Sequence, residues 1–391
     1  MAHSEQHPLK VHVDGHLAGS LFKEGGQQVF RYLSEDPEDF VSLTMPVRKR
    51  DYVHPRLHPI FEMHLPEGYL LAVIKRHFSK LVGTDDLGLL ELLASSVRGR
   101  LHYGEEGGSG ASVSLSALLK PSHEGLFEEL VERFALRSVL SGVQPKVLAR
   151  VVDKAGLGVD DYIVKAWGED YPQLALNEYW CMRVVQAAGI AVPNFYLSED
   201  ERLFIMKRFD LSDSGMAMGF EDFCVLQGRQ RDDKYQGSYE QLVKTLKTFV
   251  SPAFKHESLQ QLFKLLVVNT RLQNGDAHLK NFGVIYDDIH RIRLAPAYDV
   301  VSTTAYIPGD VSALTLMGSR KWWDKTNLLR FGVRVCDLTP SQAEKLYGEC
   351  EAAWLAVGEA MAARIGRESH PDKLRILRHL LGLSLGVRGV G

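Results

Sequence analysis

The sequence is poor in cysteine, and its four cysteines lie far apart. Cys181, Cys224, Cys336 and Cys350 include no C-x-x-C pair, so neither a zinc knuckle nor a thioredoxin-like redox site is indicated. Residues 1–7 also lack the basic-then-apolar pattern of a secretory signal. Because thiols of this kind are typical of reducing compartments, we expect a cytoplasmic protein.

Long apolar runs and an excess of one charge are lacking as well. Runs such as 265–268 are far too short to cross a bilayer, so we expect no membrane segment. The formal net charge of −3 argues against a chain that binds nucleic acid by its own charge. Any contact with DNA is therefore expected to come mainly from a partner. The 391 residues suffice for two or three compact units.

The N-terminal stretch, residues 1–103, begins with a predicted β-hairpin. Its turn is Asp14-Gly15, a dipeptide suited to the two positive-φ positions of a tight turn. Apolar residues at helical spacing predict a helix over 85–97. Residues 104–135 begin rich in Gly and Ser, which is typical of a linker, and we expect a connecting helix after it.

A third stretch, residues 136–225, combines predicted strands with one helix. The helix covers 174–188 and ends at Gly189, a residue that commonly terminates helices. The fourth stretch, 226–391, is mostly helical in its pattern. The predicted strands of the third stretch are 146–152, 162–167 and 203–206.

The most informative segment is 274–282, Asn-Gly-Asp-Ala-His-Leu-Lys-Asn-Phe. Phosphoryl transfer needs a carboxylate that orients the acceptor hydroxyl and oxygen ligands that hold metal ions against the phosphates. Kinase catalytic loops supply an Asp and, five positions later, an Asn, the separation of Asp276 and Asn281. About one such pair is expected by chance in a chain of this length. A predicted hairpin then leads to Asp299, where kinases keep a second metal-binding Asp.

Each of these residues also has an ordinary structural explanation. Asp and Asn are common in turns and at helix starts, and for any one of the three that explanation is preferred. All three occur together in a helix–loop–hairpin context, downstream of a predicted strand in which apolar residues surround Lys165. The combination favours a kinase-like phosphotransferase.

Three segments resemble signature segments of the HipA family of serine/threonine-protein kinases, the toxins of bacterial toxin–antitoxin pairs. The resemblance covers most of the chain, and the segments follow the family's order and rough spacing. It implies an α+β, protein-kinase-like two-lobed fold, with a mixed α/β N-terminal lobe, an extra N-terminal subdomain and a mainly helical C-terminal lobe. The segments are 274–282, Ala297-Tyr298-Asp299 and Ser141-Gly142-Val143-Gln144-Pro145-Lys146.

The resemblance implies a role for each matching residue. Asp276 would be the catalytic carboxylate, and Asn281 and Asp299 would bind Mg²⁺. Lys165 would reach the phosphates of ATP, with Glu178 of the following helix as its partner. The other ATP-binding positions would be Ser141, Gly142, Val143, Gln144, Pro145 and Lys146 in the phosphate loop, Lys207, Arg208, Phe209 and Asp210 in the hinge, and His278, Leu279, Lys280 and Tyr298 near the catalytic loop.

Members of the family phosphorylate themselves on a serine close to the phosphate loop. This chain has Val139 at that position, with Ser138 and Ser141 nearby, so these two serines are the candidates for self-phosphorylation. A phosphate adds nearly two negative charges. ATP would repel that charge, and the modified loop would leave the site and silence the enzyme.

The resemblance implies a growth-inhibiting toxin that depends on ATP and Mg²⁺. Its substrate would be an aminoacyl-tRNA synthetase, and its partner a helix-turn-helix antitoxin that also brings it to operator DNA. Two alternatives stay open. One is a nucleotide-binding corepressor or pseudokinase, which the full set of polar site residues disfavours. The other is a small-molecule phosphotransferase, which shares the same Asp and Asn spacing.

Two further clusters have ordinary interpretations. His54 and His58 have the spacing of a helical metal-ligand pair, but the prolines beside them disfavour a helix there. We expect loop histidines rather than a metal site. Trp322 and Trp323 lie beside basic residues and would suit stacking on single-stranded nucleic acid, although a packed loop or a partner surface is favoured.

Overall fold

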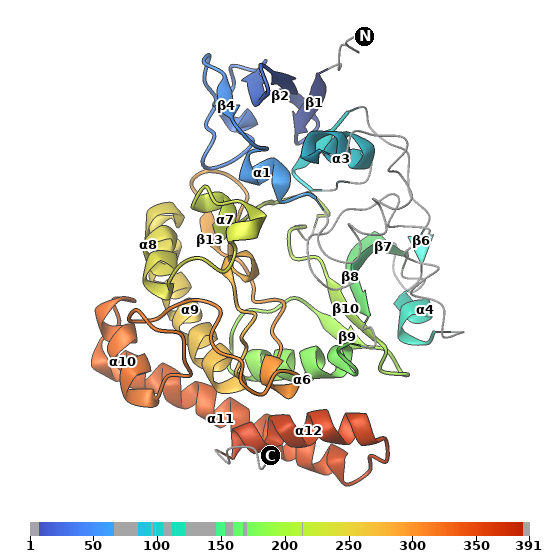
Figure 1. Cartoon of the computed structure of the whole chain (residues 1–391), viewed down its shortest axis with the longest axis vertical. Helices are drawn as coiled ribbons and strands as arrows, with labels where there is room; N and C mark the ends of the chain where they lie inside the picture. The colour runs from blue at the N-terminus through green and yellow to red at the C-terminus, as the bar shows by residue number, and fades with distance from the viewer. Residues whose placement is uncertain are drawn as a thin grey trace.

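The structure is a computed structural model that describes ten stretches of the chain. Ser138 and the 141–145 part of the expected phosphate loop lie outside them. Within the described residues the strands form three sheets, and the helices gather mainly in the C-terminal half (Figure 1). The described residues are 8–65, 85–94, 97, 99–104, 112–113, 115–121, 146–152, 159–166, 170–212 and 214–385.

The opening β-hairpin is confirmed. Strand β1 (Leu9–Val13) pairs antiparallel with β2 (His16–Glu24). Asp14 and Gly15 between them have φ values of 48° and 85°, as the turn requires.

This hairpin belongs to a five-stranded antiparallel sheet of the N-terminal subdomain. Its strand order is β4-β3-β2-β1-β5. Helices α1 and α3 contribute to its apolar core through residues such as Phe61 and Leu90, which are both buried. The predicted helix at 85–97 is shorter than expected. The remaining elements are β3 (Gln27–Tyr32), η1 (Pro37–Asp39), β4 (Tyr52–His54), α1 (Pro59–Glu62), α3 (Asp86–Leu93) and β5 (Leu101–Tyr103).

A second sheet has the order β6-β7-β8-β10-β9 and carries the predicted lysine strand. Helix α6 (Leu174–Ala187) contributes Val184 and Val185 to a large core cluster that Met206 of this sheet joins. The chain turns at Gly189, φ 68°, as predicted. The strands are β6 (Ser112–Val113), β7 (Lys146–Val152), β8 (Val159–Ala166), β9 (Phe195–Leu197) and β10 (Leu203–Lys207), with the short α4 (Leu115–Leu119) after β6.

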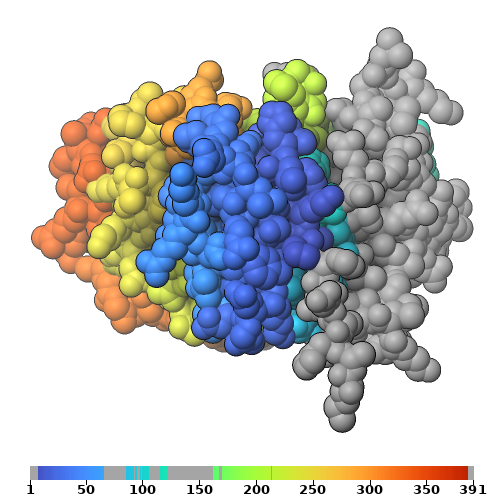
Figure 2. Space-filling view, turned by 90° about the horizontal axis from the view of Figure 1, so that it is seen from above, coloured from blue at the N-terminus to red at the C-terminus, as the bar shows by residue number. Residues whose placement is uncertain are grey.

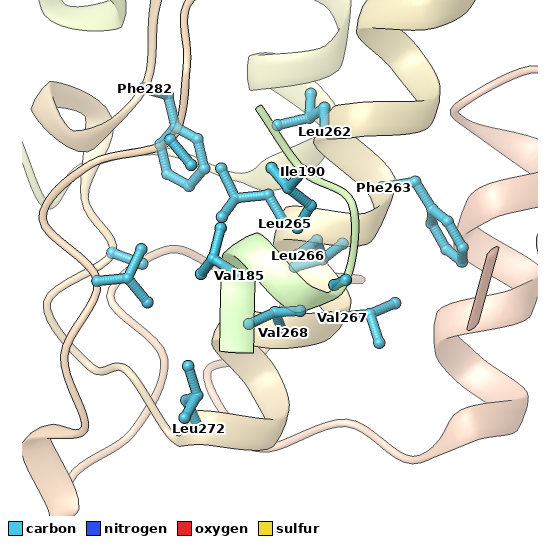
Figure 3. Packing of buried hydrophobic residues seen from close by; sticks show 14 of the residues in the cluster. Val185, Ile190, Leu262, Phe263, Leu265, Leu266, Val267, Val268, Leu272 and Phe282 are labelled. Atoms are coloured by element: carbon cyan, nitrogen blue, oxygen red, sulfur yellow. The ribbon is translucent and has the colours of Figure 1, made fainter. Parts of the chain in front are cut away.

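The C-terminal lobe is built around α9 (Pro252–Leu272). Figure 3 shows its apolar side chains together with Val185 of α6 and Phe282, which follows the predicted catalytic loop. No described helix is both long and apolar enough to span a bilayer. The other elements are β11 (Gly219–Asp222), α7 (Phe223–Leu226), η4 (Arg231–Asp233), α8 (Tyr239–Phe249), η5 (Leu279–Asn281), β12 (Gly283–Tyr286), β13 (Ile292–Leu294), η6 (Thr303–Ala305), α10 (Lys325–Arg334), α11 (Pro340–Ile365) and α12 (Pro371–Ser384).

The N-terminal subdomain lies against the C-terminal lobe, as the view from above shows (Figure 2). Glu221 of β11 is fully buried at this contact. Its carboxylate accepts hydrogen bonds from Ser42 Oγ and the Leu43 N–H, both at 2.7 Å, and from Tyr286 Oη at 2.8 Å. Burial raises the pKa of Glu221 to about 6, because a charged carboxylate is costly away from water.

The raised pKa makes the stability of this contact depend on pH. The folded state binds the Glu221 proton more tightly than the unfolded chain, so the free energy of unfolding should fall as pH rises from about 4.5 through 6. The expected contribution is about 2 kcal/mol. Urea titrations at pH 4.5 and 7 should show that Glu221→Gln removes this part of the pH dependence. The exposed Glu35→Gln variant is the control, and an unchanged pH dependence in Glu221→Gln would contradict the assignment.

Candidate active site

Lys165 lies in β8 with its amino group buried between two carboxylates. Its Nζ donates to Glu178 Oε1 on α6 and, at 2.5 Å, to Asp299 Oδ1. The Lys165 side chain is 4% exposed and that of Glu178 1%. Burial disfavours the charge on Lys165, but Asp299 and Glu178 outweigh it and raise its pKa. The predicted pairing of Lys165 with Glu178 is therefore confirmed, and the lysine is held as a cation.

Asp299 also contacts Asn281 of η5. Asn281 Nδ2 donates to Asp299 Oδ2 at 3.1 Å. Within the described chain, the buried Asn281 Oδ1 accepts no hydrogen bond. An oxygen of this kind beside a carboxylate suits Mg²⁺, which is bound by a few protein oxygens together with phosphates rather than by a full protein cage. The described residues contain no group of three or more His, Cys, Asp or Glu that could bind a metal.

The predicted catalytic loop begins where α9 ends, and polar contacts fix its shape. Asn274 Nδ2 donates to Asn269 Oδ1 at 2.9 Å, and Asn274 Oδ1 accepts the Asp276 N–H at 3.1 Å. The Gly275 N–H donates to Thr303 Oγ1 at 2.8 Å. A Cβ at Gly275 would lie 2.0 Å from Asp310 Oδ2 and 2.8 Å from Thr303 Oγ1, so any larger residue here would displace these side chains.

Asp276 lies on this loop with a side chain that is 41% exposed. Tyr235 Oη donates to its Oδ1 at 2.5 Å, and His278 Nε2 lies 3.8 Å from the same oxygen. No motif in the sequence indicates Tyr235, because it lies 41 positions before Asp276 without a recognisable spacing. The Leu279 N–H donates to the Lys234 carbonyl at 3.0 Å, so the loop contacts the 234–235 segment through both backbone and side chains.

The expected hinge follows β10. The Lys207 N–H donates to the Asn194 carbonyl at 2.8 Å, and the Arg208 guanidinium binds the Asp210 carboxylate through two nitrogens. Phe209 and Tyr298 stack with centroids 5.3 Å apart and an interplanar angle of 26°.

Tyr298 joins the expected hinge to the catalytic loop. Besides stacking on Phe209, it donates its hydroxyl to the Lys280 carbonyl at 2.7 Å. Burial raises the pKa of Tyr298 well above its usual value, so the hydroxyl stays protonated and remains a donor. Lys146 is the last residue of the expected phosphate loop. In the antiparallel register of β7 and β8 its backbone lies opposite that of Lys165.

Asn177, which sequence analysis also missed, joins α6 to the segment after Asp299. Its Nδ2 donates to the Ser302 carbonyl at 3.0 Å, and its Oδ1 accepts the Ser302 N–H at 2.9 Å. Asn177 and Ser302 are both fully buried. Because Glu178 is the next residue of α6, these two hydrogen bonds help to set the distance between Glu178 and Asp299.

The structure thus joins Lys165, Asn281 and Asp299 by direct hydrogen bonds, with Asp276 five residues before Asn281 on the same loop. His58 has a local structural role, because it caps α1 and its ring nitrogen accepts the Ile60 N–H. The buried cation of Lys165, beside the side-chain oxygens of Asn281 and Asp299, is an arrangement that can bind a nucleoside triphosphate with a divalent metal.

Family models match two parts of the chain. One described as the HipA-like C-terminal domain covers residues 138–357, and one described as the HipA N-terminal domain covers residues 9–104.

Three relatives carry provisional kinase names. Y4dM of Sinorhizobium fredii is 33% identical over 211 residues, 48% of this chain and 50% of that protein. A Haemophilus influenzae protein is 31% identical over 186 residues, 43% of this chain and 53% of that protein. The chain therefore spans about half the length of these two. Y4mE of Sinorhizobium fredii is 26% identical over 333 residues, 76% of this chain and 78% of that protein.

One solved structure covers almost the whole chain. It is the Shewanella oneidensis toxin–antitoxin complex of HipA, HipB and operator DNA, with a TM-score of 0.73 and 18% identity over 97% of this chain and 96% of the matched chain. At this identity the likeness concerns the fold, and it confirms the kinase-like α+β architecture expected from the sequence.

The Asn177 contact yields a stability prediction. Asn177→Ala removes both partners of the buried Ser302 backbone, and unsatisfied groups of this kind cost about 1–3 kcal/mol each. We expect the free energy of unfolding, measured by urea titration at pH 7, to fall by about 2–4 kcal/mol. Asn327→Ala, whose side chain makes a surface contact with Asp324, should change it by less than about 0.5 kcal/mol. Equal effects of the two substitutions would refute the prediction.

The family assignment rests on the extent of these matches. The C-terminal model alone spans more than half of the 391 residues, and the N-terminal model covers most of the preceding subdomain. The chain belongs to the HipA family.

Proposed function

We propose that this chain is an ATP- and Mg²⁺-dependent serine/threonine-protein kinase. The observation that carries the proposal is the direct contact of Lys165 and Asn281 with Asp299, next to the loop that bears Asp276. The kinase names of the relatives also support a kinase activity.

Each residue has a defined task in this proposal. Asp276, exposed at the surface of the loop, orients the acceptor hydroxyl and receives its proton. Lys165, kept charged by its two carboxylates, supplies a fixed positive charge for the phosphates. Asn281 and Asp299 bind Mg²⁺, which neutralises charge on the phosphates when bound. Residues 207–209 bind the adenine mainly through backbone groups, and Asp210 hydrogen-bonds the ribose.

Membership of the HipA family supports a proposed biological role. We propose that the protein is a growth-inhibiting toxin of the cytoplasm, held by a helix-turn-helix antitoxin, with an aminoacyl-tRNA synthetase as substrate. The Shewanella oneidensis HipA is found with HipB and operator DNA. A net charge of −3 fits a toxin that reaches operator DNA mainly through the antitoxin.

Asp276→Asn tests the proposed activity. The substitution keeps the size of the side chain but removes the proton acceptor, so phosphate transfer should fall by at least about 10³-fold. Purified protein is incubated with labelled ATP, Mg²⁺ and bacterial lysate, and growth is followed after induction. Asp200→Asn, in the turn before β10, should behave as wild type in both measurements.

A fully active and toxic Asp276→Asn variant would refute the proposed mechanism. Wild-type protein that binds ATP but labels no lysate protein would identify a nucleotide-binding protein instead. Label found only on small molecules would identify a small-molecule phosphotransferase.

Self-phosphorylation on Ser138 or Ser141 is a separate prediction. Phosphopeptide mapping after incubation with Mg²⁺ and ATP should find phosphate on one of the two serines, and the modified protein should lose transfer activity. Alanine at the modified serine should keep the enzyme active through the incubation, with alanine at the other serine as the matched control. Mapping that finds neither serine modified would rule the idea out.

A further inference from the structure

We propose that Tyr235 positions the catalytic carboxylate and that the N-terminal subdomain fixes Tyr235 through residues 230–235. We call these residues the coupling segment. The inference rests on the proposed kinase function, because it assigns a task to a residue that contacts Asp276 rather than the reactants. It gives the N-terminal subdomain a part in the activity of a site that lies in the other lobe.

Tyr235 contacts the catalytic loop through both its hydroxyl and its ring. Its hydroxyl donates to Asp276 Oδ1 at 2.5 Å. Its ring meets the His278 ring edge-on, with centroids 5.0 Å apart and an interplanar angle of 83°. A carboxylate that is 41% exposed would otherwise sample several rotamers. The phenol and the imidazole therefore restrict Asp276 to one orientation, on which proton transfer depends.

The backbone of the coupling segment is also bonded to the catalytic loop. The Lys234 carbonyl accepts the Leu279 N–H at 3.0 Å. Arg320 Nη2 donates to the Tyr235 carbonyl at 2.5 Å. With its carbonyl bonded and its ring packed on His278, Tyr235 has little freedom to move relative to Asp276.

The other end of the coupling segment is bound by the N-terminal subdomain. Glu62 of α1, 2% exposed, accepts the Arg231 N–H through Oε2 at 2.8 Å. Arg231 Nη2 donates to Asp86 of α3 at 2.9 Å. The neighbours of Arg231 are bound in the same way: Gln230 Nε2 donates to the Leu57 carbonyl at 3.2 Å, and Arg56 Nη2 to Asp232 Oδ2 at 3.2 Å.

These contacts make the place of Tyr235 depend on the N-terminal subdomain. Three consecutive residues, Gln230 to Asp232, bind that subdomain, and only Asp233 and Lys234 separate them from Tyr235. Glu62 is buried and Asp86 partly buried, with side-chain exposures of 2% and 23%. Removing Arg231 would therefore cost Asp86 its ion pair with Arg231 and leave Glu62 with its contact to Arg56 at 3.4 Å. A shift of the segment by about 1 Å is enough to lower a rate about 10²-fold.

The test uses the full chain and Tyr235→Phe, which removes only the hydroxyl. ADP release from Mg²⁺ and ATP is measured with desalted bacterial lysate as the acceptor pool. We expect kcat to fall about 10- to 100-fold while KM for ATP stays within about twofold, because Tyr235 acts on Asp276 and not on the nucleotide. Tyr347→Phe on α11 is the matched control and should retain wild-type kcat.

Two results would overturn the assignment of Tyr235. An unchanged kcat would mean that its hydroxyl is dispensable. A raised kcat would mean that the hydroxyl occupies the place of the acceptor and blocks it. If Asp276→Asn itself stays active, the proposed function fails first, whereas an inactive Asp276→Asn with a fully active Tyr235→Phe removes only this inference.

The role of the subdomain is tested with Arg231→Ala, alone and combined with Tyr235→Phe. Alone it should lower kcat, and in the Tyr235→Phe background it should have less than about a twofold further effect, because both act through Asp276. Arg31→Ala, which breaks an ion pair with Asp51 inside the subdomain, should leave kcat unchanged. If Arg231→Ala does not fold, Arg231→Lys replaces it. Effects of the two substitutions that simply multiply would refute the coupling.

Discussion

The buried amino group of Lys165 is the constraint on which the rest of the site depends. Removing a cation from water is costly unless carboxylates surround it, and here they come from Glu178 on α6 and from Asp299 beyond β13. Satisfying one lysine therefore fixes the second sheet, α6 and the C-terminal lobe relative to one another. The same charge suits a site for polyphosphate, because its position is set before any ligand arrives.

Other polar contacts hold the parts around this centre at fixed distances. Asn177 joins α6 to Ser302, and Thr303 accepts the Gly275 N–H of the catalytic loop. Glu221, itself buried, joins the N-terminal subdomain to β11 and β12 through three hydrogen bonds. Each contact is directional and at least partly buried, so it specifies one arrangement where apolar packing alone would tolerate several.

Much of the local structure could be predicted from the sequence, because its causes lie within a few residues. Asp14-Gly15 predicts a turn with two positive φ values, and Gly189 ends the helix that begins at Leu174. The spacing of Asp276 and Asn281, followed by a hairpin and Asp299, indicates the catalytic loop. Matching segments then led to the HipA family and to the pairing of Lys165 with Glu178.

The sequence by itself determined most of the elements and the family, and it predicted which charged residues form the site. Only the tertiary structure decided which ordinary polar residues support them. Tyr235 lies 41 positions from Asp276, Asn177 lies 125 from Ser302, and Glu62 lies 169 from Arg231. No periodicity or motif links such pairs, since the hydrogen bonds form only after packing has brought distant segments together. The three-dimensional packing decides which residues become partners, and their separation along the chain does not indicate it.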